Sequence, residues 1–207
     1  MESVAQWCSA GVAAERAGDR ADALQAFERA WASAATPHER AVSAHHLARV
    51  GATPAARLDW DRTALACAAD ADPRDVESLL PTLHLALATS LRRVGDTDGA
   101  RAALAAATDA AATSDTVSPA VVAAIVDGVA ACEPRDPVID AITAIGSARR
   151  FAAVAVLVQG FLSSRVAGTP DALRDAASTA SAAGLISADE AATITSGAAG
   201  PDVALGL

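Results

Sequence analysis

The segment formed by residues 7–37, WCSAGVAAERAGDRADALQAFERAWASAATP, constrains the fold of this chain more than any other segment. It has the pattern of two short amphipathic helices, over about residues 4–17 and 21–34, with Gly18 and Asp19 between them. Glycine tolerates the positive φ at which many helices end, so Gly18 marks the end of the first helix. The segment therefore predicts a helical hairpin.

The composition extends this prediction to the whole chain. Hydrophobic residues make up 52% of the sequence, and they are mostly Ala and Leu, with three Trp, three Phe and no Tyr. Alanine is the best helix former, and its small side chain lets helices approach closely. There is no clean run of alternating apolar and polar residues of the kind that predicts a strand. We therefore predict an all-α fold.

The turn of the first hairpin recurs twice. Gly51 follows Gly18 after 33 residues, and a Gly95-Asp96 turn follows after a further 44 residues. The longer interval places about ten extra residues before the third turn. We expect these residues to belong to one long helix over residues 73–94, kinked at Pro81, because an internal proline removes a helical hydrogen bond.

The first unit resembles a tetratricopeptide repeat. The positions that carry the family pattern are occupied by Trp7, Gly11, Ala23, Phe27 and Ala30, and the turn reads GDRADAL. Ala10 and Ala14 depart from the pattern, and Arg40 stands in the second unit where the first has Trp7. The resemblance covers residues 4–111 and implies a right-handed solenoid of three helical hairpins, over about residues 4–34, 37–70 and 73–111.

Residues 118–197 are expected to form additional C-terminal helices, and residues 198–207 a loose tail. Expected helices include residues 121–131, 138–147 and 149–166, a further helix capped by Thr169, and a last helix opened by a Ser187–Glu190 capping box. Three interpretations of these helices stay open: degenerate repeats, an autoinhibitory segment, or a cap that covers the last apolar face of the solenoid.

The charge and the cysteines limit the surroundings and partners of the chain. The net charge is −9 and every basic side chain is Arg, which disfavours binding to a phosphate backbone. Cys8, Cys67 and Cys132 are widely spaced, as expected for a protein of the reducing cytoplasm. The N-terminus lacks an apolar signal core, and the apolar stretch 151–162 is too short to span a bilayer. We expect that stretch to form an internal core helix, with a homo-oligomer interface as the alternative.

The tetratricopeptide resemblance implies that the first helix of each hairpin lines a concave groove in which a peptide lies. Carrying the groove positions over to this sequence selects Cys8, Arg16, His38, His45, Arg49, Thr89, Arg92 and Arg93. Of these, Arg16, Arg49 and Arg93 occupy the same position, two residues before each turn glycine. A row of guanidinium groups suits an acidic peptide or a peptide C-terminus. The alternative is that these arginines complement the dipoles of their helices.

The sequence offers little to catalysis or to cofactors. There is no HExxH motif, and His38 and His45 are seven residues apart, about 10 Å along a helix, which is too far to share one metal ion. Neither a G-x-S-x-G element nor a nucleotide-binding glycine motif occurs. We therefore expect a protein that is not an enzyme and has no cofactor.

These observations favour a protein–protein interaction scaffold that binds a peptide or protein segment, acidic in character, in the groove. The alternative is a structural or regulatory subunit whose C-terminal helices pack on the groove or mediate oligomerisation. Neither nucleic acid nor membrane is expected among the partners.

Overall fold

A computed structural model describes residues 3–114, 117–132, 137–147, 150–166, 169 and 171–198. Within these ranges the regular structure is entirely helical and no strand occurs, which confirms the predicted all-α fold. The chain divides into two compact units, Met1–Ala100 and Arg101–Leu207. Among the described residues, no helix combines the length and apolar character needed to cross a bilayer.

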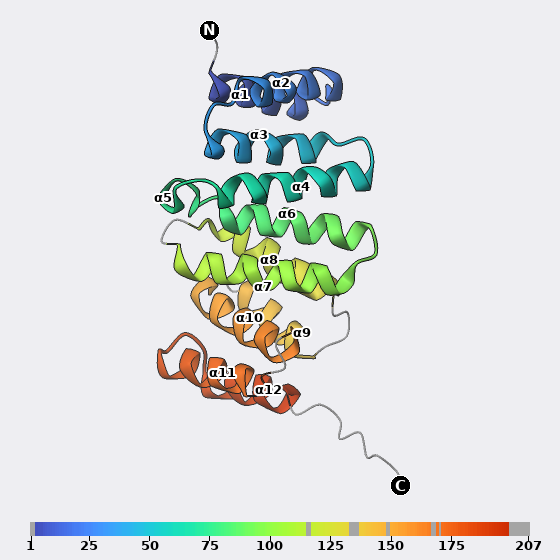
Figure 1. The fold of residues 1–207 in the computed structure, drawn as a ribbon. Helices are drawn as coiled ribbons and strands as arrows, with labels where there is room; N and C mark the ends of the chain where they lie inside the picture. The colour runs from blue at the N-terminus through green and yellow to red at the C-terminus, as the bar shows by residue number, and fades with distance from the viewer. Residues whose placement is uncertain are drawn as a thin grey trace. The chain divides into compact units, whose positions relative to one another are not determined.

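Twelve helices are assigned in the described ranges, and Figure 1 labels them in chain order. The first unit contains α1 (Val4–Arg16), α2 (Arg20–Ser33), α3 (Pro37–Val50), α4 (Pro54–Ala69), α5 (Pro73–Val76) and α6 (Leu80–Arg93). Helix α7 (Thr97–Thr113) crosses the boundary between the units. The second unit contains α8 (Pro119–Cys132), α9 (Pro137–Ser147), α10 (Phe151–Val166), α11 (Ala172–Ala182) and α12 (Ala188–Ala198).

In the first unit, helices that follow one another in the chain pack side by side. Helix α1 packs on α2 and α3 packs on α4, while α2 also lies against α3 and α4 against α6. The layers follow this order in Figure 1, from the blue α1 and α2 to the green α6. Side-chain caps fix where two of these helices begin, because Ser3 and Thr36 each form a complete capping box.

The three turn glycines do not have one common role. Gly18 and Gly95 have φ values of 82° and 86°, in the left-handed region that glycine adopts without strain. Gly51 has a φ of −51°, which any residue can adopt. There an added Cβ atom would lie 2.7 Å from Cγ of Arg57, so this position needs glycine because space is short.

The expected long helix over residues 73–94 is wrong. Two helices replace it, because α5 ends at Val76 and α6 begins at Leu80, with a turn between them. Pro81 is therefore the second residue of α6 and lies in its first turn. Backbone N–H groups in that turn have no partner within the helix, so proline loses nothing there.

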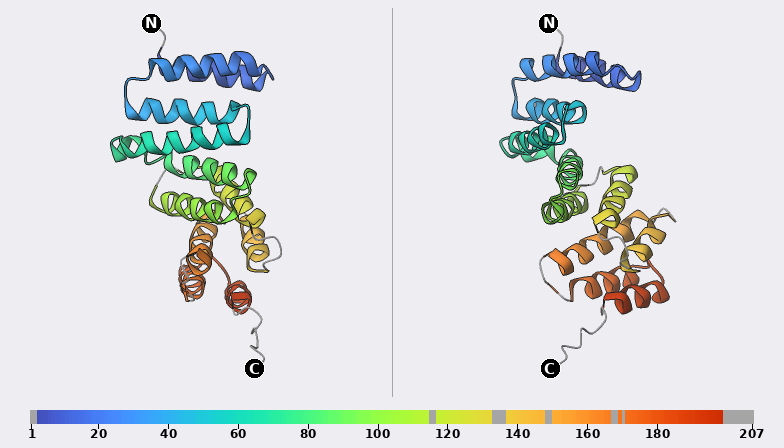
Figure 2. Two further views of the ribbon diagram at one scale, coloured as in Figure 1. Left: turned by 45° about the vertical axis from the view of Figure 1, so that its right-hand side comes forward. Right: turned by 90° about the vertical axis from the view of Figure 1, so that its right-hand side faces the viewer.

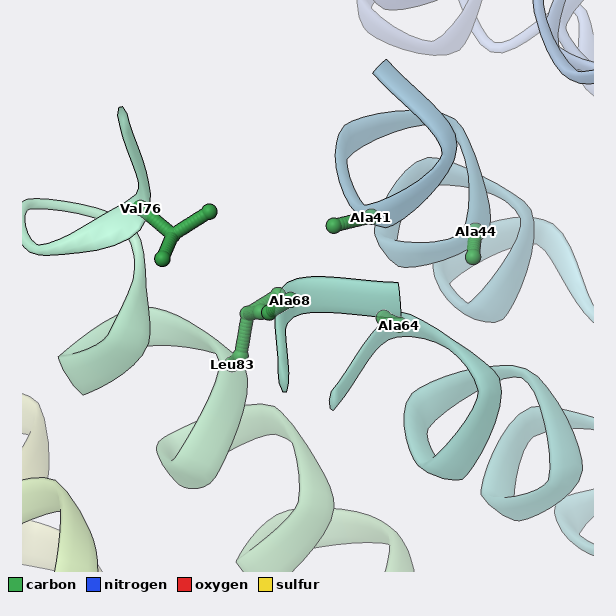
Figure 3. Packing of buried hydrophobic residues seen from close by; sticks show 6 residues of the cluster. All are labelled: Ala41, Ala44, Ala64, Ala68, Val76 and Leu83. Carbon is green, nitrogen blue, oxygen red and sulfur yellow. The ribbon is translucent and has the colours of Figure 1, made fainter. Parts of the chain in front are cut away.

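One buried ring joins the first three helices. The side chain of Phe27 on α2 is fully buried, and it occupies the space left by Gly11 on α1. An added Cβ atom at Gly11 would lie only 2.3 Å from Cε1 of the ring. A separate cluster in the first unit combines small side chains of α3 and α4 with Val76 and Leu83, as Figure 3 shows; the small ones are Ala41, Ala44, Ala64 and Ala68.

The second unit has a core of larger aliphatic side chains. Its fully buried residues include Val129, Ile142, Leu157, Phe161, Leu173 and Ile194. The apolar stretch 151–162 lies in α10, where Leu157, Phe161 and Leu162 are at most 2% exposed, in agreement with an internal core helix. At Gly160 an added Cβ atom would lie 2.3 Å from Cβ of Ala176, so α10 and α11 approach closely.

Two cap predictions for the second unit have different outcomes. The capping box at Ser187 is confirmed, because the Glu190 amide donates to the Ser187 hydroxyl (3.2 Å) and the Ser187 amide donates to the Glu190 carboxylate (2.7 Å). Thr169 is not the cap of its helix: α11 follows Asp171, and only the backbone carbonyl of Thr169 accepts a bond, from Ala172. The expected loose tail, residues 198–207, lies outside the described residues from residue 199 onward.

The contact between Gly11 and Phe27 predicts that Gly11→Ala destabilises the protein. Alanine in a helix is normally favourable relative to glycine, but here its methyl group overlaps a buried ring that is held on its other side by α3. We expect the free energy of unfolding, measured by urea denaturation, to fall by about 1–3 kcal/mol.

Ala10→Ser, at the exposed neighbouring position, is the matched control and should change stability by less than about 0.5 kcal/mol. A Gly11→Ala protein that is as stable as the parent would contradict the packing described.

Candidate functional site

The four arginines selected from the sequence lie in the last turns of α1, α3 and α6. Arg16 is the last residue of α1, Arg49 is in the last turn of α3, and Arg92 and Arg93 end α6. All four are exposed. No contact joins Arg16, Arg49 and Arg93 directly, so their alignment as one row stays a prediction. The carbonyl groups at a helix end carry partial negative charge, so each position also complements a helix dipole.

An ion pair connects two of the three helices. Nη2 of Arg49 lies 2.7 Å from Oε2 of Glu15, which places the last turn of α3 beside that of α1. The two side chains are 44% and 30% exposed, so water screens the pair and its contribution to stability is small. Its consequence for binding is larger, because Glu15 already occupies one of the guanidinium groups predicted to bind a ligand.

Two adjacent histidines on α3 are neutral. The ring of His46 stacks on Phe27, with centroids 4.8 Å apart and planes within 7°, and the His45 ring is 5.7 Å from the His46 ring. Burial lowers the pKa of each imidazole to about 4, assisted by the nearby charge of Arg49. The Nδ1 atoms of both rings are buried without a hydrogen-bond partner. His45, one of the predicted groove residues, therefore carries no positive charge at neutral pH.

The remaining predicted groove residues are less accessible to a ligand than their sequence positions suggested. The thiol of Cys8 is 7% exposed and packs with Val4 and Ala30; burial raises its pKa, against the effect of a hydrogen bond with Ser43. The hydroxyl of Thr89 donates to the Leu85 carbonyl (3.0 Å) within α6. His38 is half-buried in the first turn of α3. The four arginines are thus the most accessible members of the predicted set.

Sequence reasoning missed a buried polar pair between α4 and α6. The hydroxyl of Ser90 donates to the carboxylate of Asp61 at 2.6 Å, and the two residues are 4% and 3% exposed. Burial raises the pKa of Asp61, whereas the bond from Ser90 and the charges of Arg93 and Arg57 act against that rise. An aspartate at an apolar position of a helix is the only signal in the sequence that could have indicated this pair.

The histidines, cysteines and acidic residues are scattered. In the part of the chain that the structure describes, no three of them are arranged to hold a metal ion. Near Arg49 the structure brings together one guanidinium group, the Glu15 carboxylate and the two neutral imidazoles.

Comparisons with known proteins leave the family open. No protein-family model matches the sequence, and neither a curated protein nor a solved structure matches it. The tetratricopeptide resemblance therefore rests on the repeated residues of the chain itself.

The buried histidines predict a loss of stability in mild acid. Their pKa is about 4 in the folded chain and about 6.5 when unfolded, so the unfolded state binds protons more readily as the pH falls. Above about pH 7 the two histidines cause no loss of folding stability, and the loss develops as the pH falls from about 6.5 to 4. For each histidine, one unit of difference between the folded and unfolded pKa corresponds to about 1.4 kcal/mol in the free energy of unfolding. His46→Phe keeps an aromatic ring against Phe27 but cannot be protonated.

We expect the midpoint of urea unfolding to decline less steeply between pH 7 and 4.5 for His46→Phe than for the parent chain. His38→Gln is the matched control, and its pH dependence should follow the parent. Identical slopes for His46→Phe and the parent would show that His46 is not held neutral by the fold.

Proposed function

We propose that the chain is a non-catalytic scaffold for protein–protein interaction, built in its first part from tetratricopeptide-like hairpins that form a right-handed solenoid. Its ligand is an acidic peptide or protein segment, bound on the surface that α1, α3 and α6 share. We place this role in the cytoplasm, since Cys8, Cys67 and Cys132 are all free thiols.

The observation that carries the proposal is the stacking of consecutive hairpins in the first unit. Helix α2 packs against both α1 and α3, and α1 also meets α3 through the Glu15–Arg49 pair. The first helices of two successive hairpins thus become neighbours, as in a helical-hairpin solenoid. The helix direction also changes along the stack: in the right-hand view of Figure 2 the blue α2 lies across the page, whereas the green α6 is seen nearly end-on.

The acidic character of the ligand follows from the arginines. Arg16, Arg92 and Arg93 are exposed at helix ends on the first helices of the hairpins, in a chain whose net charge is −9. A guanidinium group binds a carboxylate through two parallel hydrogen bonds. If these arginines only complement helix dipoles, they bind no acidic ligand. The following measurement distinguishes this explanation from the proposal.

We expect a fluorescent octapeptide of alternating Glu and Gly to bind the full chain, with an affinity that falls as salt is added. In Arg16→Glu/Arg93→Glu, fluorescence anisotropy should report at least about tenfold weaker binding, since each charge-assisted contact contributes about 1.5–3 kcal/mol. Arg62→Glu/Arg74→Glu, at exposed positions on α4 and α5, makes the same change of charge away from the proposed surface and should bind within about twofold of the parent. Equal losses for the two proteins would contradict the proposed surface.

A change in the opposite direction comes from Glu15. Glu15→Gln removes the carboxylate that lies 2.7 Å from Arg49, so Arg49 becomes available to the peptide. We expect about two- to fivefold tighter binding of the same peptide. Unchanged binding would show that Arg49 does not contact the peptide. The roles of Arg16 and Arg93 are tested separately by the charge reversal.

A further inference from the structure

The second unit contains a cavity of about 140 Å³ between α8, α9 and α10. Among the residues that the structure describes, its lining is mostly aliphatic, with two polar side chains, Asp127 and Thr143; the other described lining residues are Val122, Ala123, Val126, Gly146 and Val154. All of these residues belong to one unit, and none of them belongs to the surface proposed above.

The inner part of the cavity is apolar and of definite size. Val126 and Val154 are 5% and 1% exposed, so these two side chains form a buried aliphatic floor. An apolar cavity of about 150 Å³ in another protein is large enough to accept benzene. The volume here therefore suits an apolar body of five or six carbon atoms.

The mouth of the cavity carries a negative charge. Asp127 and Ala123 are exposed, in contrast to the buried valines, so they lie where the cavity opens to solvent. Within the described part of the chain, no hydrogen bond or ion pair engages Asp127. An exposed aspartate is negatively charged at neutral pH, and it therefore favours a ligand with a cationic group at the mouth. The half-buried Thr143 adds a hydroxyl to the same wall.

Gly146 keeps part of this space open. An added Cβ atom there would lie 3.4 Å from Cγ2 of Val154, which is ordinary van der Waals contact. The neighbouring residues could therefore accept alanine without rearrangement, and the absence of a side chain leaves room between α9 and α10. An alanine at this position would narrow the cavity and leave the fold intact.

We propose that this cavity binds a small primary amine, with the hydrocarbon part among Val122, Val126 and Val154 and the ammonium group beside the carboxylate of Asp127. The ligand class follows from the joint presence of a buried aliphatic floor and a carboxylate at the opening. This site is independent of the acidic-peptide surface, and either assignment can fail without the other.

The test is an NMR titration of the isotope-labelled full chain with benzylamine, and in parallel with benzyl alcohol, which has a similar shape but no charge. We expect benzylamine to shift the methyl signals of Val122, Val126 and Val154, and to bind about three- to tenfold more tightly than the alcohol. Equal binding of the two compounds, or the absence of shifts at these valines, would overturn the proposal.

Two variants test the two parts of the site. Asp127→Asn should reduce the affinity for benzylamine about three- to tenfold while leaving that for benzyl alcohol unchanged, and Gly146→Ala should weaken both. Asp140→Asn removes an exposed carboxylate on α9 that does not line the cavity, and it should bind as the parent does. The amide spectrum of each variant verifies folding, and a well-folded Asp127→Asn protein that keeps the parent's preference for the amine would also overturn the proposal.

Discussion

The first unit depends on the ring of Phe27. In a chain with three Phe and no Tyr, many of the buried side chains of the first unit are alanines, which allow close approach but specify register weakly. The Phe27 ring fits where Gly11 leaves space on α1, and stacks on His46 of α3. One side chain of α2 thereby fixes the helix before it and the helix after it. A second aromatic contact, edge to face between Trp31 and Trp60 at 5.2 Å, connects α2 to α4.

Arginine side chains also connect the helices, because the last carbonyl groups of a helix have no partner within it and can accept hydrogen bonds from a guanidinium group. Arg20, the first residue of α2, donates through Nη2 to the carbonyls of Val50 (2.7 Å) and Gly51 (2.6 Å), at the end of α3. Arg150, directly before α10, donates through Nε to the Leu185 carbonyl (2.9 Å), in the turn after α11. In each unit the start of one helix is thus held to the end of the next by a guanidinium group. Arg20 and Arg150 therefore contribute to structure, in contrast to the exposed arginines at the ends of α1 and α6 that we propose bind a ligand.

Much of the fold could be predicted from local sequence, whereas most of the site could not. The turn glycines Gly18 and Gly51 located the ends of α1 and α3, since such signals act within a few residues of the chain. A proline fits both a kink within a helix and the first turn of a new helix, so Pro81 by itself does not distinguish the two. The break before Pro81 depends on how Val76 and Leu83 pack together against α3 and α4. The burial of His45, the Glu15–Arg49 pair and the cavity beside Asp127 arise from contacts between separate helices, for which a single sequence has no signal.

In the proposed role, stacked hairpins would present the arginines at the ends of α1, α3 and α6 to one ligand. Backbone chemical-shift mapping of the full chain with the acidic octapeptide tests this role most directly. Binding at the shared surface should shift amides in the last turns of α1, α3 and α6 and leave the outer face of α4 around Arg62 unchanged. Shifts confined to α2 and α4, or no shifts at a peptide concentration that saturates anisotropy, would contradict it.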